Sequence, residues 1–204
     1  TLWHPMDALD ITLSYLQQKI EQDGAPEVEL ALAGDYEQRR FNTGIAGSHD
    51  EFLQNEIDIT NLVVVYELDW ATITNSFSLV NYDYKGEEDF SSLISFVAPF
   101  FPAALELADK PYYRQNDAYS DNTTNEFRLV SQLDGPLQIS AGLYYEKIRS
   151  GSSGAYLPSG DPNLTTYSTV LDQSYPAELK QKAVFSELSY NITEQLKVTV
   201  GGRY

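Results

Sequence analysis

The chain has 204 residues, of which 42% are hydrophobic and 13% aromatic, a composition that supports a folded domain and excludes a wholly disordered chain. Its formal net charge is −17, with 13 basic residues against 30 acidic ones, which argues against the clustered positive charge of a nucleic-acid-binding surface. Cysteine is absent, so neither a disulfide framework nor thiolate chemistry is available.

Alternation of apolar and polar residues, the pattern of a β-strand with two different faces, recurs along the whole chain. The first alternating segment places Leu9, Ile11 and Leu13 between polar residues. No run of about 18 apolar residues occurs, so no membrane-spanning helix is predicted. In chain order, strands are predicted at residues 9–22, 56–68, 72–84, 126–133, 137–146, 181–190 and 196–204.

The connections between these strands alternate between short and long. Short turns are predicted at residues 4–8, 69–71, 134–136 and 191–195, and long connections at residues 23–52, 85–122 and 149–178. Compact soluble domains seldom contain three connections of roughly 30 residues. Outer-membrane barrels combine short periplasmic turns with long extracellular loops. The sequence therefore predicts an all-β, antiparallel up-and-down meander forming part of a transmembrane β-barrel, with about seven or eight strands of a larger barrel.

Aromatic residues flank two of the predicted short turns. Trp3, Tyr66 and Trp70 lie where the aromatic girdle of a membrane barrel meets the lipid headgroups. The same residues could equally be ordinary core aromatics.

The connection at residues 85–122 is rich in aromatic and apolar residues. One interpretation is a platform for a bulky ligand, and the other is a loop core that folds down over the mouth of the barrel. The residues proposed for the platform are Phe96, Phe100, Phe101, Tyr112 and Tyr113.

Catalytic and cofactor motifs are lacking. There is no nucleotide-binding glycine loop and no acid–base constellation. The segment His49-Asp50-Glu51 has no partner cluster and is more typical of a solvated loop than of a metal site. We therefore expect neither an enzyme, nor a metal site, nor a cofactor.

Two stretches resemble a known family. Residues 125–147 contain E-x-R-L-x-S, then D-G, then G-L-Y-Y, and residues 183–204 contain A-x-F-x-E-x-x-Y followed by L-x-x-T-x-G-x-R-Y. Both resemble paired barrel strands of TonB-dependent outer-membrane receptors. Residues 2–24 and 66–84 are similar to other hairpins of these barrels. Ile139 departs from the pattern, since this branch often has Trp there.

The resemblance implies a location in the outer membrane of a Gram-negative bacterium and a role in active uptake of a metal chelate or similar nutrient. The family's barrel has about 22 strands, and its plug and energy-coupling box have no counterpart here. Residues 1–204 are therefore interpreted as an internal fragment of one β-barrel domain. The implied partners are outer-membrane lipid and lipopolysaccharide, the TonB protein acting through the plug, and an unknown small-molecule ligand, with no nucleic acid.

Several polar residues are expected to point into the barrel. They could contact the plug, or they could solvate the lumen and form cross-strand ion pairs. These residues are Glu126, Arg128, Gln132, Gln138, Glu146 and Arg203.

Two other functions compete with active uptake. One is a passive porin-type barrel, and the other is a soluble, secreted β-sandwich that binds carbohydrate. A sandwich packs its apolar residues between two sheets, whereas a membrane barrel points them outward. The side chains that decide between these are Leu9, Ile11, Leu129, Ile139, Leu143 and Val198.

Overall fold

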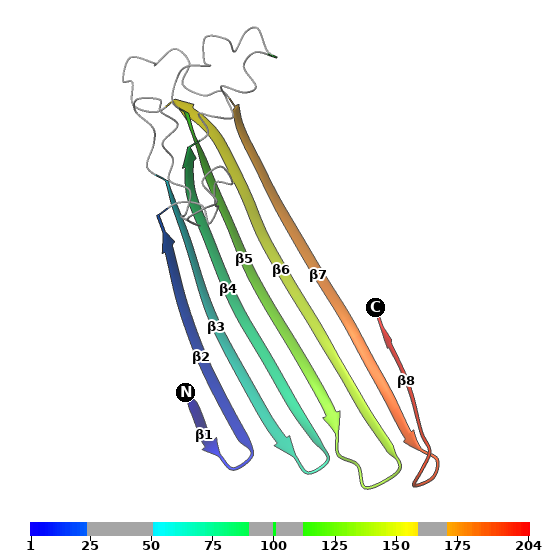
Figure 1. Ribbon diagram of the computed structural model, residues 1–204. Helices are drawn as coiled ribbons and strands as arrows, with labels where there is room; N and C mark the ends of the chain where they lie inside the picture. The colour runs from blue at the N-terminus through cyan, green and yellow to red at the C-terminus, as the bar shows by residue number, and fades with distance from the viewer. Residues whose placement is uncertain (24–50, 90–99, 101–111, 159–170) are drawn as a thin grey trace, which may run out of the picture.

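The computed structural model describes residues 1–23, 51–89, 100, 112–158 and 171–204. They form one antiparallel sheet in which each of eight strands pairs with its neighbours in sequence (Figure 1). No helix in the described ranges is long and apolar enough to cross a membrane. The strands are β1 (Leu2–Met6), β2 (Leu9–Gln22), β3 (Phe52–Leu68), β4 (Ala71–Asp89), β5 (Tyr112–Ser131), β6 (Leu137–Pro158), β7 (Leu171–Asn191) and β8 (Lys197–Arg203).

The short connections all lie at one end of the sheet, at the bottom of Figure 1. The predicted up-and-down meander is thus confirmed. The first turn is tighter than predicted, because His4, Pro5 and Met6 belong to β1 and Met6 pairs with Leu9. An irregularity between Trp3 and Met6 accommodates Pro5, which has no N–H to donate to a ladder.

The strands extend farther from these turns than predicted. The connections expected at residues 85–122 and 149–178 were wrong in their bounds, because β4 continues to Asp89, β5 begins at Tyr112, β6 continues to Pro158 and β7 begins at Leu171. The ladder here is held by backbone hydrogen bonds while polar side chains occupy both faces. Such a segment lacks the apolar alternation by which strands are predicted.

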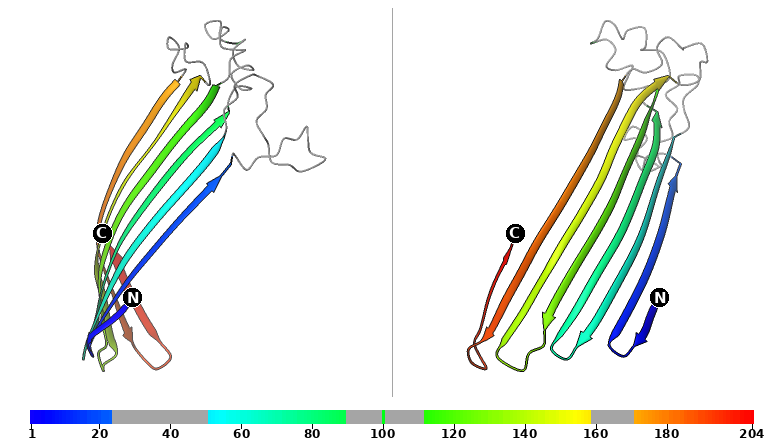
Figure 2. Two further views of the ribbon diagram at one scale, coloured as in Figure 1. Left: turned by 90° about the vertical axis from the view of Figure 1, so that its left-hand side faces the viewer. Right: turned by 180° about the vertical axis from the view of Figure 1, so that it is seen from behind.

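The sheet is curved, as the left view of Figure 2 shows. In β4, Leu79, Asn81, Asp83 and Lys85 are exposed, whereas the residues between them are half-buried or buried. Side chains crowd together on the concave side of a curved sheet, so these four residues lie on the convex side. We call the convex side the outer face and the concave side the inner face.

An apolar band covers the outer face beside the short turns. In β6 it runs from Leu137 to Tyr145, about the length of strand that crosses a bilayer. The cross-strand register places side chains from seven strands in this band: Leu9, Ile11, Leu13, Tyr15, Leu62, Val64, Tyr66, Ile73, Phe77, Leu79, Phe127, Leu129, Leu137, Ile139, Leu143, Tyr145, Val184, Leu188, Tyr190, Val198 and Val200.

Nothing in the described part of the chain covers this band. Leu143 is 55% exposed and Val184 is 58% exposed, although the two residues face each other across β6 and β7. A β-sandwich would bury such residues against a second sheet. The described strands form a single sheet, so the sandwich hypothesis was wrong.

Candidate functional site on the inner face

Charged and aromatic side chains from four neighbouring strands meet on the inner face. The register aligns Glu126 with Tyr144, and Arg128 with Gly142. It also places Phe185 of β7 between Gly142 of β6 and Arg203 of β8. We call these residues the inner-face cluster: Glu126, Arg128, Gly142, Tyr144, Phe185 and Arg203.

Arg128 is fixed by two neighbours. Its Nη2 lies 2.7 Å from Oε1 of Glu126, two residues earlier in β5 and therefore on the same face. The guanidinium carbon of Arg128 lies 5.7 Å from the centre of the Phe185 ring. This distance is within the range of a cation–π interaction, which favours a flat, delocalised cation over an aromatic ring.

Gly142 provides the space in which Phe185 lies. A Cβ atom added at Gly142 would approach Cζ of Phe185 to 2.3 Å and the carbonyl oxygen of Phe127 to 2.7 Å. The aromatic ring therefore lies directly over the glycine backbone. A larger residue here would push Phe185 away from Arg128.

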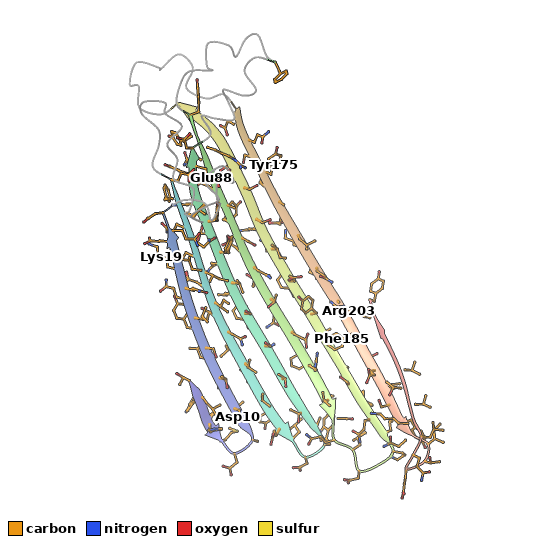
Figure 3. The ribbon with its side chains drawn as sticks, in the orientation of Figure 1. Asp10, Lys19, Glu88, Tyr175, Phe185 and Arg203 are labelled. Carbon is orange, nitrogen blue, oxygen red and sulfur yellow. The ribbon has the colours of Figure 1, made fainter. Side chains whose placement is uncertain are left out.

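A second arginine, Arg203 of β8, stacks in the same way on Tyr144 of β6. The guanidinium carbon of Arg203 lies 5.1 Å from the centre of the Tyr144 ring. Arg203 and Phe185 are direct cross-strand partners, and Figure 3 shows the two side chains close together on β8 and β7. Two guanidinium groups are thus held by aromatic rings on one wall.

This arrangement suits recognition of oxygen-rich groups. Guanidinium groups carry several donors in a fixed plane and match the geometry of carboxylates. Glu126 and Glu146 add acceptors on the same face, and Glu146 accepts a 3.3 Å hydrogen bond from Asn122. In the described residues, no three His, Cys, Asp or Glu side chains converge as a metal site.

The six residues predicted to point inward divide into two groups. Glu126, Arg128, Glu146 and Arg203 lie on the inner face. Gln138 lies on the same face at the short-turn end, where it bonds within the turn that precedes it and Gln132 donates a 2.7 Å hydrogen bond to Thr72. Contact of any of them with a plug stays a prediction.

Gln138 closes the connection between β5 and β6. Its Nε2 donates to the carbonyl of Leu133 at 2.7 Å, and its Oε1 accepts from the hydroxyl of Ser131 at 2.9 Å. The hydroxyl of Ser131 in turn accepts from the backbone N–H of Ile139. The side chain of Gln138 is therefore occupied in holding the turn.

The proposed aromatic platform is not assembled by the residues that the structure describes. Phe96 and Phe101 lie outside the described residues, and Phe100 is 71% exposed. Tyr112 is fully buried, and this burial raises the pKa of its hydroxyl. Because β5 begins at Tyr112, Tyr112 and Tyr113 point to opposite faces and cannot share one ligand surface.

The three aromatic residues predicted at the membrane interface lie at the short-turn end. Trp3 pairs with Ile11, and Tyr66 pairs with Leu9, so both side chains lie on the outer face. Trp70 lies in the turn between β3 and β4 and is 51% exposed. Their contact with lipid headgroups stays a prediction.

Sequence reasoning missed Gly142, Tyr144 and Phe185. Each was part of an alternating strand, but nothing local indicated which residue of a neighbouring strand lay opposite it. The register brings Arg128 over Phe185 although 57 positions separate them along the chain. Only knowledge of the pairing could have revealed this cluster.

A single curved sheet with an apolar convex band and a charged concave wall is the architecture of a transmembrane β-barrel wall. The family model described as "TonB dependent receptor-like, beta-barrel" matches residues 9–204. The chain belongs to this family. It is a family of transport receptors rather than a class of enzymes.

Solved structures agree on the fold. The ferric yersiniabactin uptake receptor FyuA from Yersinia pestis matches with a TM-score of 0.67 at 14% identity, over 96% of this chain and 26% of that chain. The RagAB peptide transporter matches with a TM-score of 0.58 at 12% identity, over 99% of this chain and 26% of that one. The chain thus spans about a quarter of the length of these two structures. The comparison with curated proteins found no match.

Proposed function

We propose that the chain is part of the barrel wall of an outer-membrane receptor that takes up a metal chelate in a Gram-negative bacterium, energised by the TonB system. One observation supports this most. Along β6, the outward residues Leu137, Ile139 and Leu143 are apolar, while the inward residues Ser140 and Glu146 are polar or charged. Such a strand suits the boundary between lipid and an aqueous lumen.

Family membership favours active uptake over a passive porin. In such a receptor, short turns face the periplasm and the long strands project outward beyond the bilayer. In this proposal, residues 1–204 are one portion of a barrel domain with further strands, and a separate plug domain lies inside the complete barrel. Energy from TonB reaches the ligand through that plug.

The inner-face cluster is the surface that we assign to the ligand path or to the plug. Arg128 and Arg203 present fixed donors, and the adjacent Glu126 and Glu146 limit the excess of positive charge. An anionic chelate with oxygen donors suits such a wall. The solved neighbours carry different cargo by their titles, one a ferric chelate and one a peptide, so both classes are used as probes.

The test is uptake by cells that carry or lack the complete receptor, measured with an iron-55-labelled hydroxamate chelate and with a labelled peptide. Active transport predicts saturable uptake that is lost on deletion of the receptor, on deletion of TonB and after collapse of the proton-motive force. A porin would transport without energy and without saturation at low concentration. Receptor-dependent uptake that persists after collapse of the proton-motive force would contradict the proposal.

A further inference from the structure

A cluster of positive charge lies on the outer face directly beyond the apolar band. Lys147 and Lys180 face each other across β6 and β7, and the next rows contribute Lys182 and Arg149. We call these four residues the cationic patch. Its occurrence is unexpected in a chain with 13 basic residues and a net charge of −17.

On β3, β4 and β5 the outer face beyond the band carries more acids than bases, with Lys85 as its outward base. On β3, β4 and β5 the outward residues at this distance from the short turns include Asp58, Asp83, Asp117 and Asp121. The cationic patch is therefore a local reversal of sign, confined to β6 and β7. A surface that needs only to be solvated does not require positive and negative side chains to be separated in this way.

The cationic patch contains more positive charge than its own acids neutralise. Glu178 lies 2.5 Å from Lys180, 3.2 Å from Arg149 and 3.6 Å from Lys147. Hydrogen bonds from Lys180 and Arg149 lower the pKa of Glu178 to about 2. The carboxylate therefore stays charged at neutral pH, yet even with Asp121 opposite Arg149 the four cations exceed the two acids.

The pairing of Lys147 with Lys180 is the strongest sign that this surface favours an anion. Like charges placed directly opposite each other on adjacent strands destabilise a sheet. The Lys180 side chain is 55% exposed and that of Arg149 is 60% exposed, so both can reach an external group. An anion with several oxygen atoms would relieve the repulsion through charge-assisted hydrogen bonds.

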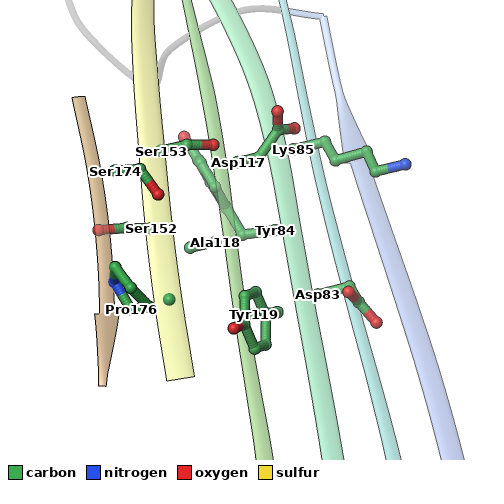
Figure 4. A pocket seen from close by; sticks show the side chains of 11 residues that line it. Asp83, Tyr84, Lys85, Asp117, Ala118, Tyr119, Ser152, Ser153, Ser174 and Pro176 are labelled. Carbon is green, nitrogen blue, oxygen red and sulfur yellow. The ribbon is translucent and has the colours of Figure 1, made fainter. Parts of the chain in front are cut away.

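A groove lies farther along the same two strands. It has a volume of about 160 Å³ and is lined by side chains of β4, β5, β6 and β7 (Figure 4). Tyr119 lies against Gly151, where an added Cβ would meet the ring at 2.6 Å. Asp117, Ser153 and Ser174 also line the groove, so it combines an aromatic ring with several hydrogen-bonding groups.

On β6 and β7 the outer face thus presents three zones in a fixed order. Tyr145 and Val184 end the apolar band, the row Lys147–Lys180 lies in the cationic patch, and Gly151 borders the groove. In a phosphorylated glycolipid with an extended headgroup, acyl chains, a phosphorylated sugar backbone and further sugars occur in the same order.

We propose that the outer face of β6 and β7 binds one phosphorylated glycolipid of the outer leaflet, with its phosphate on Lys147, Arg149, Lys180 and Lys182 and its sugar in the groove beside Tyr119. This site rests on the membrane orientation given under Proposed function. A lipid, rather than a free anion, is the occupant because the apolar band continues without a gap into the cationic patch. The bound lipid strengthens the contact between barrel and membrane at this position.

The test uses the purified full-length receptor in lipid nanodiscs that contain lipid A with or without its phosphates. The double variant Lys180→Gln/Lys182→Gln removes two cations from the cationic patch. The matched control Lys19→Gln/Lys197→Gln removes the same charge from β2 and β8, away from it. Glu178→Gln changes the charge of the cationic patch in the opposite direction.

We expect the double variant to bind phosphorylated lipid A about tenfold more weakly than the control and Glu178→Gln to bind it more tightly. Dephosphorylated lipid A should not distinguish these variants. Equal binding of phosphorylated lipid A by the double variant and the control would overturn the site. Competition by millimolar inorganic phosphate as effective as by the lipid would overturn the assignment to a lipid.

The sugar assignment has its own test. Tyr119→Ala should weaken binding of lipid A that carries core sugars several-fold but leave binding of phosphorylated lipid A without core sugars unchanged. Equal effects on both lipids, or none on either, would overturn the assignment of the groove to a sugar. These assays measure lipid binding and not transport. Failure of the uptake proposal and failure of the proposed lipid site can therefore be distinguished.

Discussion

Replacing Gly142 with valine is expected to destabilise the folded barrel by about 3 kcal/mol or more. Intrinsic propensity predicts the opposite, since valine favours strands and glycine weakens them. The steric clash determines the sign of the change in stability, because a Cβ here meets both Phe185 and the backbone carbonyl of Phe127. The measurement is urea unfolding of the full-length receptor in detergent, followed by the change in electrophoretic mobility between folded and unfolded barrel.

Two further variants separate this clash from a general effect of replacing glycine. At Gly202 an added Cβ has no atom within 4 Å, so Gly202→Ala should change stability by less than about 0.5 kcal/mol. Adding Phe185→Ala to Gly142→Val should restore only part of the loss, because the contact with the Phe127 carbonyl persists. Wild-type stability of Gly142→Val would show that the inner-face cluster is not packed as described.

Replacing Leu143 with arginine is expected to cost about 1–3 kcal/mol in a bilayer, because Leu143 lies between the middle of the apolar band and its outer edge. Leu143 lies in the apolar band of β6 and is 55% exposed, so no protein atoms need to move to accommodate a longer side chain. In water such a substitution at an exposed strand position would have little effect. The cost arises from placing a charge in hydrocarbon, and it is measured as folding efficiency into lipid vesicles.

The matched control places the same charge on the inner face. Ser140 lies opposite Glu187, three positions before Leu143 and on the other side of the sheet. Ser140→Arg should therefore fold into vesicles nearly as well as the wild type, because its guanidinium faces the lumen and a carboxylate. Equal impairment by the two substitutions would mean that the two faces do not differ in their surroundings.

The sequence was sufficient to predict the meander and its apolar face. Alternation is visible wherever one face is apolar, so the strand containing Leu9, Ile11 and Leu13 was identified correctly. The segments beyond the apolar band were not identified, because polar residues on both faces leave no alternation. For the same reason, Tyr112 and Tyr113 were assigned to a loop instead of to β5.

The sites depended on register, which a single sequence does not reveal. Arg128 and Arg203 were expected on the inner face from alternation alone, but their aromatic partners lie on other strands. Lys147 and Lys180 are separated by 33 positions, and only the pairing of β6 with β7 makes them neighbours. Gln138 lies on the expected face, but its contacts are determined by turn geometry, which strand alternation does not reveal.

The outward side chains of β6 should contact lipid, and the inward ones should contact water. A cysteine scan of residues 137–145 in the full-length receptor tests this alternation most directly. The chain has no cysteine of its own, so each substitution introduces one label into this region. Spin labels at 137, 139, 141, 143 and 145 should collide with oxygen dissolved in the bilayer, and those at 138, 140 and 144 with a water-soluble nickel complex. Gly142 is left unlabelled, because an added Cβ there would clash with Phe185. Uniform exposure to water along the strand, or the opposite alternation, would contradict a membrane-spanning barrel wall.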